Sequence, residues 1–160
     1  MEGSPTAQPE DRRAVELALR AVSARDRTVA ELRMYLERKR VEPAAIDGAV
    51  AALASAGLVD DERYAYRFTE DKQQLQRWGS ERIARELQKR GVAPEVVQAA
   101  LSSTARSDEL AAATSLLHER YGVPRDDRER DRAWRLLVRR GYEPELAYEA
   151  LRELARTTPA

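Results

Sequence analysis

The sequence predicts an all-α protein, an elongated tandem array of three three-helix repeat units with about nine helices. The first observation is a repeat, because Pro43, Pro94 and Pro144 stand 51 and then 50 residues apart. Self-similarity at a fixed period is typical of repeat proteins, whose units bury their apolar faces against one another. The second is composition: 42% of the 160 residues are hydrophobic, 6% aromatic and 35% charged, and Ala, Leu, Arg and Glu favour helices. No hairpin dipeptide and no long alternation of β-branched residues indicates strands.

The same pattern surrounds each of the three prolines. A leucine stands seven residues before it (Leu36, Leu87 and Leu137) in a basic segment. An apolar stripe follows it with the i, i+3, i+4, i+7 spacing of one helix face. The stripe residues are Ile46, Ala49, Val50 and Leu53, then Val97, Ala100 and Leu101, then Ala147, Ala150, Leu151 and Leu154.

The first unit is expected at residues 10–57, after a polar, disordered lead-in at residues 1–9. Its first helix is predicted over residues 11–22. Thr28 begins the second helix, with Glu31 three residues later completing a capping box. Pro43 opens the third helix, because the first helical position needs no N–H. Gly57 ends it with the left-handed conformation that terminates helices.

The second and third units are expected at residues 58–106 and 107–156. Asp60 is predicted to cap the fourth helix, with Asp61 and Glu62 favourably placed against the helix dipole in its first turn. Ser80 is predicted to cap the fifth helix, which ends at Gly91. The other helices are predicted from Pro94, from Ser107 with Asp108 to Gly122, after the charged stretch 125–132 to Gly141, and from Pro144 to about Arg156.

Charge and cysteine content restrict the classes of function. The 28 basic and 28 acidic side chains cancel, so net charge favours neither a nucleic acid nor a membrane as partner. The chain has no cysteine, which excludes disulfides and thiolate chemistry. No apolar run approaches the roughly 20 residues that span a bilayer. We therefore expect a cytoplasmic, monomeric protein.

Catalytic and metal sites are not indicated. His118 is the only histidine, and spacing identifies no serine or acid as its partner for catalysis. Asp60, Asp61 and Glu62 could be metal ligands or hydrolytic carboxylates, but a capped acidic helix start explains all three. The seven glycines form no phosphate-binding loop. We predict neither an enzyme nor a bound cofactor or metal.

Two basic stripes are the strongest functional signal. Residues 77–92 contain five cations and two acids, and residues 132–141 contain four arginines and no acid. Guanidinium groups in a row can pair with phosphates or with an acidic protein groove. Solvated helix faces are the alternative, and Trp78 and Trp134 beside the stripes either stack on bases or pack between helices. The candidate contact residues are Arg82, Arg85, Lys89, Arg90, Arg132, Arg135, Arg139 and Arg140.

One string is more specific than these patterns: Gly-Leu-Val-Asp-Asp-Glu-Arg-Tyr-Ala at residues 57–65, followed by Gly79 and a short basic helix that ends at Gly91. It resembles the RecX family of regulators of the RecA recombinase over most of residues 28–101, and residues 137–142 agree in the third unit. The chain departs from the family pattern at Thr28, Arg40 and Trp78, and Arg40 puts the geometry of the first turn in question. The motif residues are Gly57, Leu58, Asp60, Asp61, Arg63, Tyr64, Ala65, Gly79, Gly91 and Gly141.

The resemblance implies a protein that binds the RecA–DNA filament. Such a regulator restrains ATP hydrolysis, strand exchange and coprotease activity in recombination, DNA repair and the SOS response. The alternatives are a helical-repeat protein that binds single- or double-stranded DNA directly, an adaptor unrelated to recombination, and a hydrolase that Asp61→Asn would inactivate.

Overall fold

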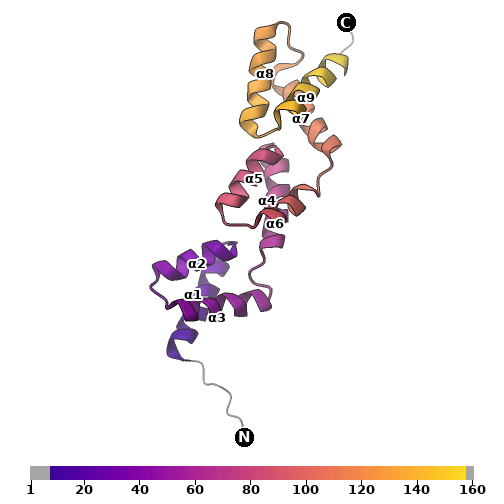
Figure 1. The fold of residues 1–160 in the computed structure, drawn as a ribbon. Helices are drawn as coiled ribbons and strands as arrows, with labels where there is room; N and C mark the ends of the chain where they lie inside the picture. Colours follow the sequence, from indigo (N-terminus) through magenta and orange to yellow (C-terminus); the bar gives the residue numbers. More distant parts are fainter. Residues whose placement is uncertain (1–7, 158–160) are drawn as a thin grey trace. The chain divides into compact units, whose positions relative to one another are not determined.

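The computed structural model describes residues 8–157 and contains nine α-helices and no strand within that range (Figure 1). The predicted all-α class is confirmed. The helices are α1 (Pro9–Ala24), α2 (Val29–Arg38), α3 (Pro43–Ser55), α4 (Asp61–Gln76), α5 (Ser80–Lys89), α6 (Pro94–Leu101), α7 (Arg106–Tyr121), α8 (Asp127–Arg140) and α9 (Pro144–Thr157). Residues 1–7 of the predicted lead-in lie outside the described residues, and Pro9 already belongs to α1.

Packing divides the described chain into two compact units. Residues up to Tyr64 together with Lys89–Ala93 form the N-terminal unit, and Ala65–Gln88 with the residues from Pro94 onward form the C-terminal unit. Helices α4 and α5 therefore each contribute to both units. The predicted repeat boundaries at 57/58 and 106/107 stay a prediction.

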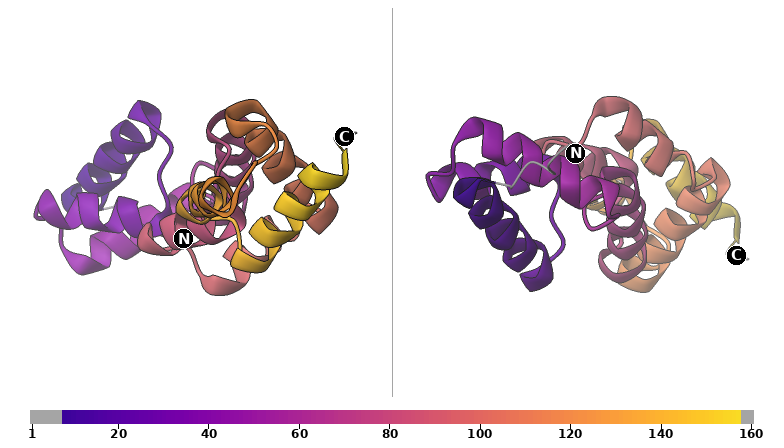
Figure 2. Two further views of the ribbon diagram at one scale, coloured as in Figure 1. Left: turned by 90° about the horizontal axis from the view of Figure 1, so that it is seen from above. Right: turned by 90° about the horizontal axis from the view of Figure 1, so that it is seen from below.

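The N-terminal unit is built from α1, α2 and α3, which lie against one another in both views of Figure 2. Its core joins alanines of α1, such as Ala14 and Ala18, to Leu32, Leu36 and Ile46. All five side chains are buried. Alanines on one helix face let the neighbouring helices approach closely while leucine and isoleucine supply the apolar area.

The C-terminal unit has a second core, formed by α7, α8 and α9. Leu117, Leu137 and Tyr142 are buried there. The stripes after Pro43 and Pro144 lie in these two cores. The stripe after Pro94 buries Val97 and Ala100, and of all the stripe residues only Leu101 remains partly exposed. Helices α4, α5 and α6 bury Ala65, Thr69, Ile83, Leu87, Val97 and Ala100.

Several predicted helix ends are confirmed by hydrogen bonds. The Thr28 hydroxyl accepts from the Glu31 N–H at 3.1 Å, and the Glu31 carboxylate accepts from the Thr28 N–H at 3.4 Å, so the capping box forms. Asp60 accepts from the Arg63 N–H at 3.0 Å.

Three predicted helix starts are wrong. Ser80 is the first residue of α5 and not its cap, and α7 begins at Arg106, one residue before Ser107. Helix α8 begins at Asp127 inside the charged stretch 125–132, because Asp126 caps it by accepting from the Glu129 N–H at 2.7 Å.

The turn that ends the second helix of each repeat has one backbone conformation. Gly91 and Gly141 have φ angles of 81° and 90°, and Arg40 takes the same left-handed region with φ 57°. The substitution of arginine for glycine therefore leaves the turn intact. Its cost is steric, because a Cβ in the left-handed region lies too close to the following carbonyl oxygen.

Replacing Arg40 with glycine is expected to stabilise the protein by about 1 kcal/mol, since it relieves this strain while adding some freedom to the unfolded chain. The Arg40 side chain is exposed, so little contact area is lost. Urea unfolding followed by circular dichroism measures the change. Arg38→Gly, at the exposed last residue of α2, is the control and should destabilise by roughly 0.5–1 kcal/mol. A destabilised Arg40→Gly variant would contradict the assignment of strain.

Candidate functional site

The eight cations predicted to contact a partner fall into two groups. Arg85, Lys89, Arg132, Arg135 and Arg139 are exposed. Arg82, Arg90 and Arg140 are half-buried, and each makes contacts within the protein. Lys89 and Arg90 belong to the N-terminal unit and the other six to the C-terminal unit.

The exposed arginines of α8 form a stripe, which we call the α8 stripe: Arg132, Arg135 and Arg139. It lies opposite the buried Ala133 and Leu137, because residues separated by three and four positions share one helix face. Arg135 pairs with Asp131 at 3.1 Å, an acid that precedes the acid-free run counted from Arg132. Both side chains of this pair are largely exposed, so the pair is weak and leaves Arg135 available to a partner.

The Arg82 side chain packs on an aromatic cluster. Its guanidinium carbon lies 3.9 Å from the centre of the Trp78 ring, and the Lys72 ammonium lies 4.9 Å from the same centre. Phe68 meets Trp78 edge-on at 6.4 Å. Cations held over an indole are stabilised by its π-electrons. Trp78 therefore packs within the protein.

Trp134 also has partners within the protein. Its indole N–H donates to the Pro144 carbonyl at 3.3 Å, and its ring lies 5.4 Å from the ring of Tyr148. This contact joins α8 to α9. For both tryptophans the structure favours helix packing over the alternative of stacking on bases.

Arg90 takes part in a junction at the start of α2. The Thr28 hydroxyl donates to the Arg90 carbonyl at 2.7 Å, and the Asp61 carboxylate accepts from the Val29 N–H at 2.9 Å. The Arg90 guanidinium donates to Glu31 at 2.9 Å. Because the first N–H groups of a helix have no partner inside it, Asp61 supplies an acceptor that the start of α2 lacks. The two Arg90 contacts hold the basic turn against the same helix start.

Arg140 takes part in an equivalent junction at the start of α5. The Gly79 N–H donates to the Arg140 carbonyl at 2.9 Å, and the Glu81 N–H donates to the Gly141 carbonyl at 3.0 Å. The Glu109 carboxylate accepts from the Ser80 N–H at 2.8 Å. The carbonyl end of α8 and a carboxylate of α7 thus cap α5, which explains why Ser80 is not needed as a cap.

Both junctions require glycine at the basic turn. A Cβ on Gly91 would lie 2.4 Å from the Ala30 Cβ, and a Cβ on Gly141 would lie 2.2 Å from the Arg82 Cβ. Gly79 lies equally close to the Gly141 backbone, where a Cβ would be 2.4 Å from the carbonyl oxygen. These distances are shorter than any van der Waals contact, so the glycines permit the close approach.

The other motif residues shape the loop into α4. Arg63 donates to the Gly57 carbonyl at 2.8 Å and lies 4.0 Å from Asp60. Ala65 is buried, whereas Leu58 is 47% exposed. Tyr64 is half-buried, and burial is the main cause that raises the pKa of its phenol, to which Arg90 is hydrogen-bonded.

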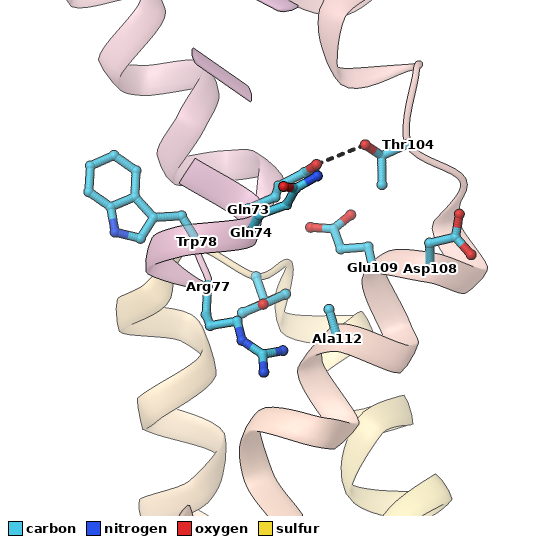
Figure 3. A pocket seen from close by; sticks show the side chains of 9 residues that line it. Gln73, Gln74, Arg77, Trp78, Thr104, Asp108, Glu109 and Ala112 are labelled. Carbon is cyan, nitrogen blue, oxygen red and sulfur yellow. Dashed lines mark hydrogen bonds between the residues drawn. The ribbon is translucent and has the colours of Figure 1, made fainter. Parts of the chain in front are cut away.

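A cavity of about 380 Å³ lies in the C-terminal unit between the end of α4 and the start of α7 (Figure 3). Thr104 donates across it to Gln73 at 2.9 Å. Its lining contains both signs of charge, and two of the charged groups are engaged: Arg77 pairs with Glu119 at 3.0 Å, and Glu109 caps α5. None of the eight predicted contact cations lines it.

Comparison with known proteins identifies the family. Models described as the first and second three-helix domains of RecX match residues 14–53 and 60–101. The regulatory protein RecX of Trichlorobacter lovleyi is 37% identical over 134 residues, which cover 81% of this chain and 87% of that protein. This chain belongs to the RecX family. The regulatory protein RecX of Halorhodospira halophila is also 37% identical, over 79% of each chain.

A solved RecX structure has the same fold. The crystal structure of RecX from Lactobacillus salivarius superposes with a TM-score of 0.84, covering 92% of this chain and 97% of that one at 19% identity. Within the described residues, no helix is both long and apolar enough to cross a membrane.

In this RecX-family chain, Asp61 acts as a cap for a helix other than its own. No group of three potential metal ligands occurs within residues 8–157. Burial is the main cause that raises the pKa of the Asp61 carboxyl above its ordinary value of 3.8, the Val29 N–H opposes the rise, and the charges of Asp60 and Glu31 add to it. The position thus needs an oxygen acceptor more than a charge.

Asp61→Ala is therefore expected to destabilise the protein by about 1 kcal/mol, the usual effect of losing a helix cap, whereas Asp61→Asn retains the acceptor.

Because the pKa of the Asp61 carboxyl is raised in the folded state, folding favours the protonated acid. That contribution is full below pH 3.8 and is lost as pH rises through the folded-state pKa. Asp61→Asn should thus gain stability relative to wild type from acidic to neutral pH.

Urea unfolding of wild type, Asp61→Ala and Asp61→Asn, at acidic and at neutral pH, measures these changes in the free energy of unfolding. The exposed neighbour Glu62 supplies the control, since Glu62→Ala should shift stability by less than about 0.5 kcal/mol. An alanine variant as stable as wild type would exclude the capping role.

Proposed function

We propose that this protein binds the filament that the RecA recombinase forms on DNA and restrains its activity. Membership of a family whose members are named regulatory proteins supports this proposal. We propose a non-catalytic role in which the bound protein lowers ATP hydrolysis, strand exchange and coprotease activity. It would act in the cytoplasm as a monomer.

The contact surface in this proposal is basic. The α8 stripe offers three exposed guanidinium groups on one helix face, and Arg85 and Lys89 on α5 are also exposed. Guanidinium groups pair bidentately with carboxylates or phosphates, and the Lys89 ammonium attracts either anion as a point charge. These groups therefore suit either the recombinase or the DNA inside the filament. Arg82, Arg90 and Arg140 would support the surface through the internal contacts described above.

Titration of the protein into recombinase of the same organism, assembled on single-stranded DNA, tests the proposal. ATP hydrolysis and filament length should both fall as the protein is added. Unchanged hydrolysis and length at several-fold molar excess would refute it. Binding to bare DNA that weakens steeply with salt, without any effect on the filament, would favour the alternative of a protein that binds DNA alone.

A further inference from the structure

The C-terminal unit contains a groove that the α8 stripe does not include. It lies between α9 and the segment that leads into α8, has a volume of about 210 Å³, and we call it the α9 groove. The half-buried Val123 and Pro124 and the exposed Ala155 supply apolar surface above the buried Leu151, and Arg130, Arg152 and Arg156 supply charge. Its lining includes no carboxylate. Arg130 precedes Arg132 of the stripe by two residues, a rotation of roughly 200° about the helix axis, so groove and stripe face different directions.

Two of the three arginines have unused hydrogen-bonding capacity. Within residues 8–157 the side chains of Arg130 and Arg152 make no hydrogen bond or ion pair. Arg156 pairs with Glu153 at 3.4 Å, but the Arg156 side chain is 75% exposed, and such surface pairs are weak. The carboxylates of Glu145 and Glu149 line the neighbouring hollow together with Arg130 and Arg152, but neither lines the α9 groove, and Glu149 pairs with Arg106 at 3.0 Å. The groove thus presents guanidinium donors that a carboxylate can fill.

The apolar surface of the α9 groove distinguishes between two classes of anionic ligand, a nucleic-acid backbone and an acidic peptide. A phosphate backbone would satisfy the arginines but would not cover the apolar surface of the half-buried Val123 and Pro124 and the exposed Ala155. A peptide that carries carboxylates on either side of one apolar side chain satisfies both features, because its apolar group can enter the groove while the acids reach the arginines. Charge complementarity and the apolar surface therefore favour the same ligand.

We infer that the α9 groove is a second binding site, which takes an acidic peptide segment with a central apolar side chain. The segment would belong to a partner protein, and the inference holds whether or not that partner is the filament. Arg130 and Arg152 are the specificity-determining residues, and Ala155, which is exposed in the groove wall, adjoins the apolar side chain.

A fluorescent synthetic peptide of glutamates and aspartates around one leucine provides the test, with binding to the full chain followed by anisotropy. Arg130→Glu/Arg152→Glu should weaken binding at least roughly tenfold, since two favourable charge contacts become repulsive. Arg132→Glu/Arg139→Glu makes the same change of charge on the α8 stripe and should alter binding less than about twofold. Circular dichroism checks that each variant keeps its helices.

Two further measurements separate the apolar contribution of the groove to binding from the contribution of its charges. Replacing the peptide leucine with serine, or Ala155 with tryptophan to fill the groove, should weaken binding without any change in protein charge. Equal binding of the leucine and serine peptides would overturn the inference, because charge alone would then explain the affinity. Tighter binding of a single-stranded oligonucleotide than of the peptide, lost in Arg130→Glu/Arg152→Glu, would overturn it in favour of a nucleic-acid site.

Discussion

Gly141→Ala is expected to lower the free energy of unfolding by about 3 kcal/mol, the sum of left-handed backbone strain and overpacking. The new Cβ would lie 2.2 Å from the Cβ of Arg82 and 2.6 Å from its backbone nitrogen. Neither atom can move without shifting α5. The start of α5 would have to withdraw from the carbonyls of Arg140 and Gly141, leaving its first N–H groups without acceptors.

Gly57→Ala separates the backbone strain from the overpacking. Gly57 also has a positive φ, 69°, but nothing lies within 4 Å of the place that its Cβ would occupy. It should therefore cost only the backbone strain, roughly 1–2 kcal/mol. Urea unfolding of both variants, followed by circular dichroism, measures the difference. Equal destabilisation by the two substitutions would mean that the close approach at Gly141 contributes nothing.

Reversing the charge of the α8 stripe is expected to produce the largest functional loss. Arg132→Glu/Arg135→Glu/Arg139→Glu should raise the concentration needed to inhibit recombinase ATP hydrolysis at least tenfold, about 1.4 kcal/mol of binding free energy. Three contacts that attract anions become repulsive, while the buried face of α8 is untouched. Circular dichroism and thermal unfolding should remain close to wild type.

The matched control reverses three exposed arginines of the N-terminal unit, Arg12, Arg20 and Arg38. It changes the net charge by the same amount, so a general electrostatic effect would weaken inhibition equally in both variants. Inhibition by the stripe variant at wild-type concentrations would mean that the stripe is only a solvated helix face. The proposal that the protein regulates the filament would survive that result, but its contact surface would have to lie elsewhere.

Features that depend on neighbouring residues in the sequence were predictable. The capping box of Thr28 and Glu31 needs only a spacing of three, and the apolar stripes need only the helical period. The turn at Arg77 could not be predicted from its neighbouring residues. It ends α4 with φ 53°, a conformation usually left to glycine, and the Trp78 N–H bonds to the Lys72 carbonyl at 3.1 Å. No glycine or asparagine signals this turn.

The junctions were not predictable, because their partners are far apart in sequence. Arg90 and Glu31 pair across 59 residues, and nothing in either local pattern links them. The repeat itself could have helped, since Arg90 and Arg140 stand 50 residues apart. The capping acids, Asp61 and Glu109, are 48 apart, and this shift of two residues conceals their common role. Charge patterns identify exposed arginines such as Arg132 but do not distinguish them from half-buried ones such as Arg140.

The arginine at position 40 also limits how this array could grow. In both junctions a basic turn receives the start of a helix from the preceding repeat, at a distance that only glycine allows. The first turn has the same backbone but carries a side chain on the surface where that helix would dock. A repeat engineered ahead of the first would meet the Arg40 side chain at this contact. A longer engineered array would therefore first need Arg40→Gly.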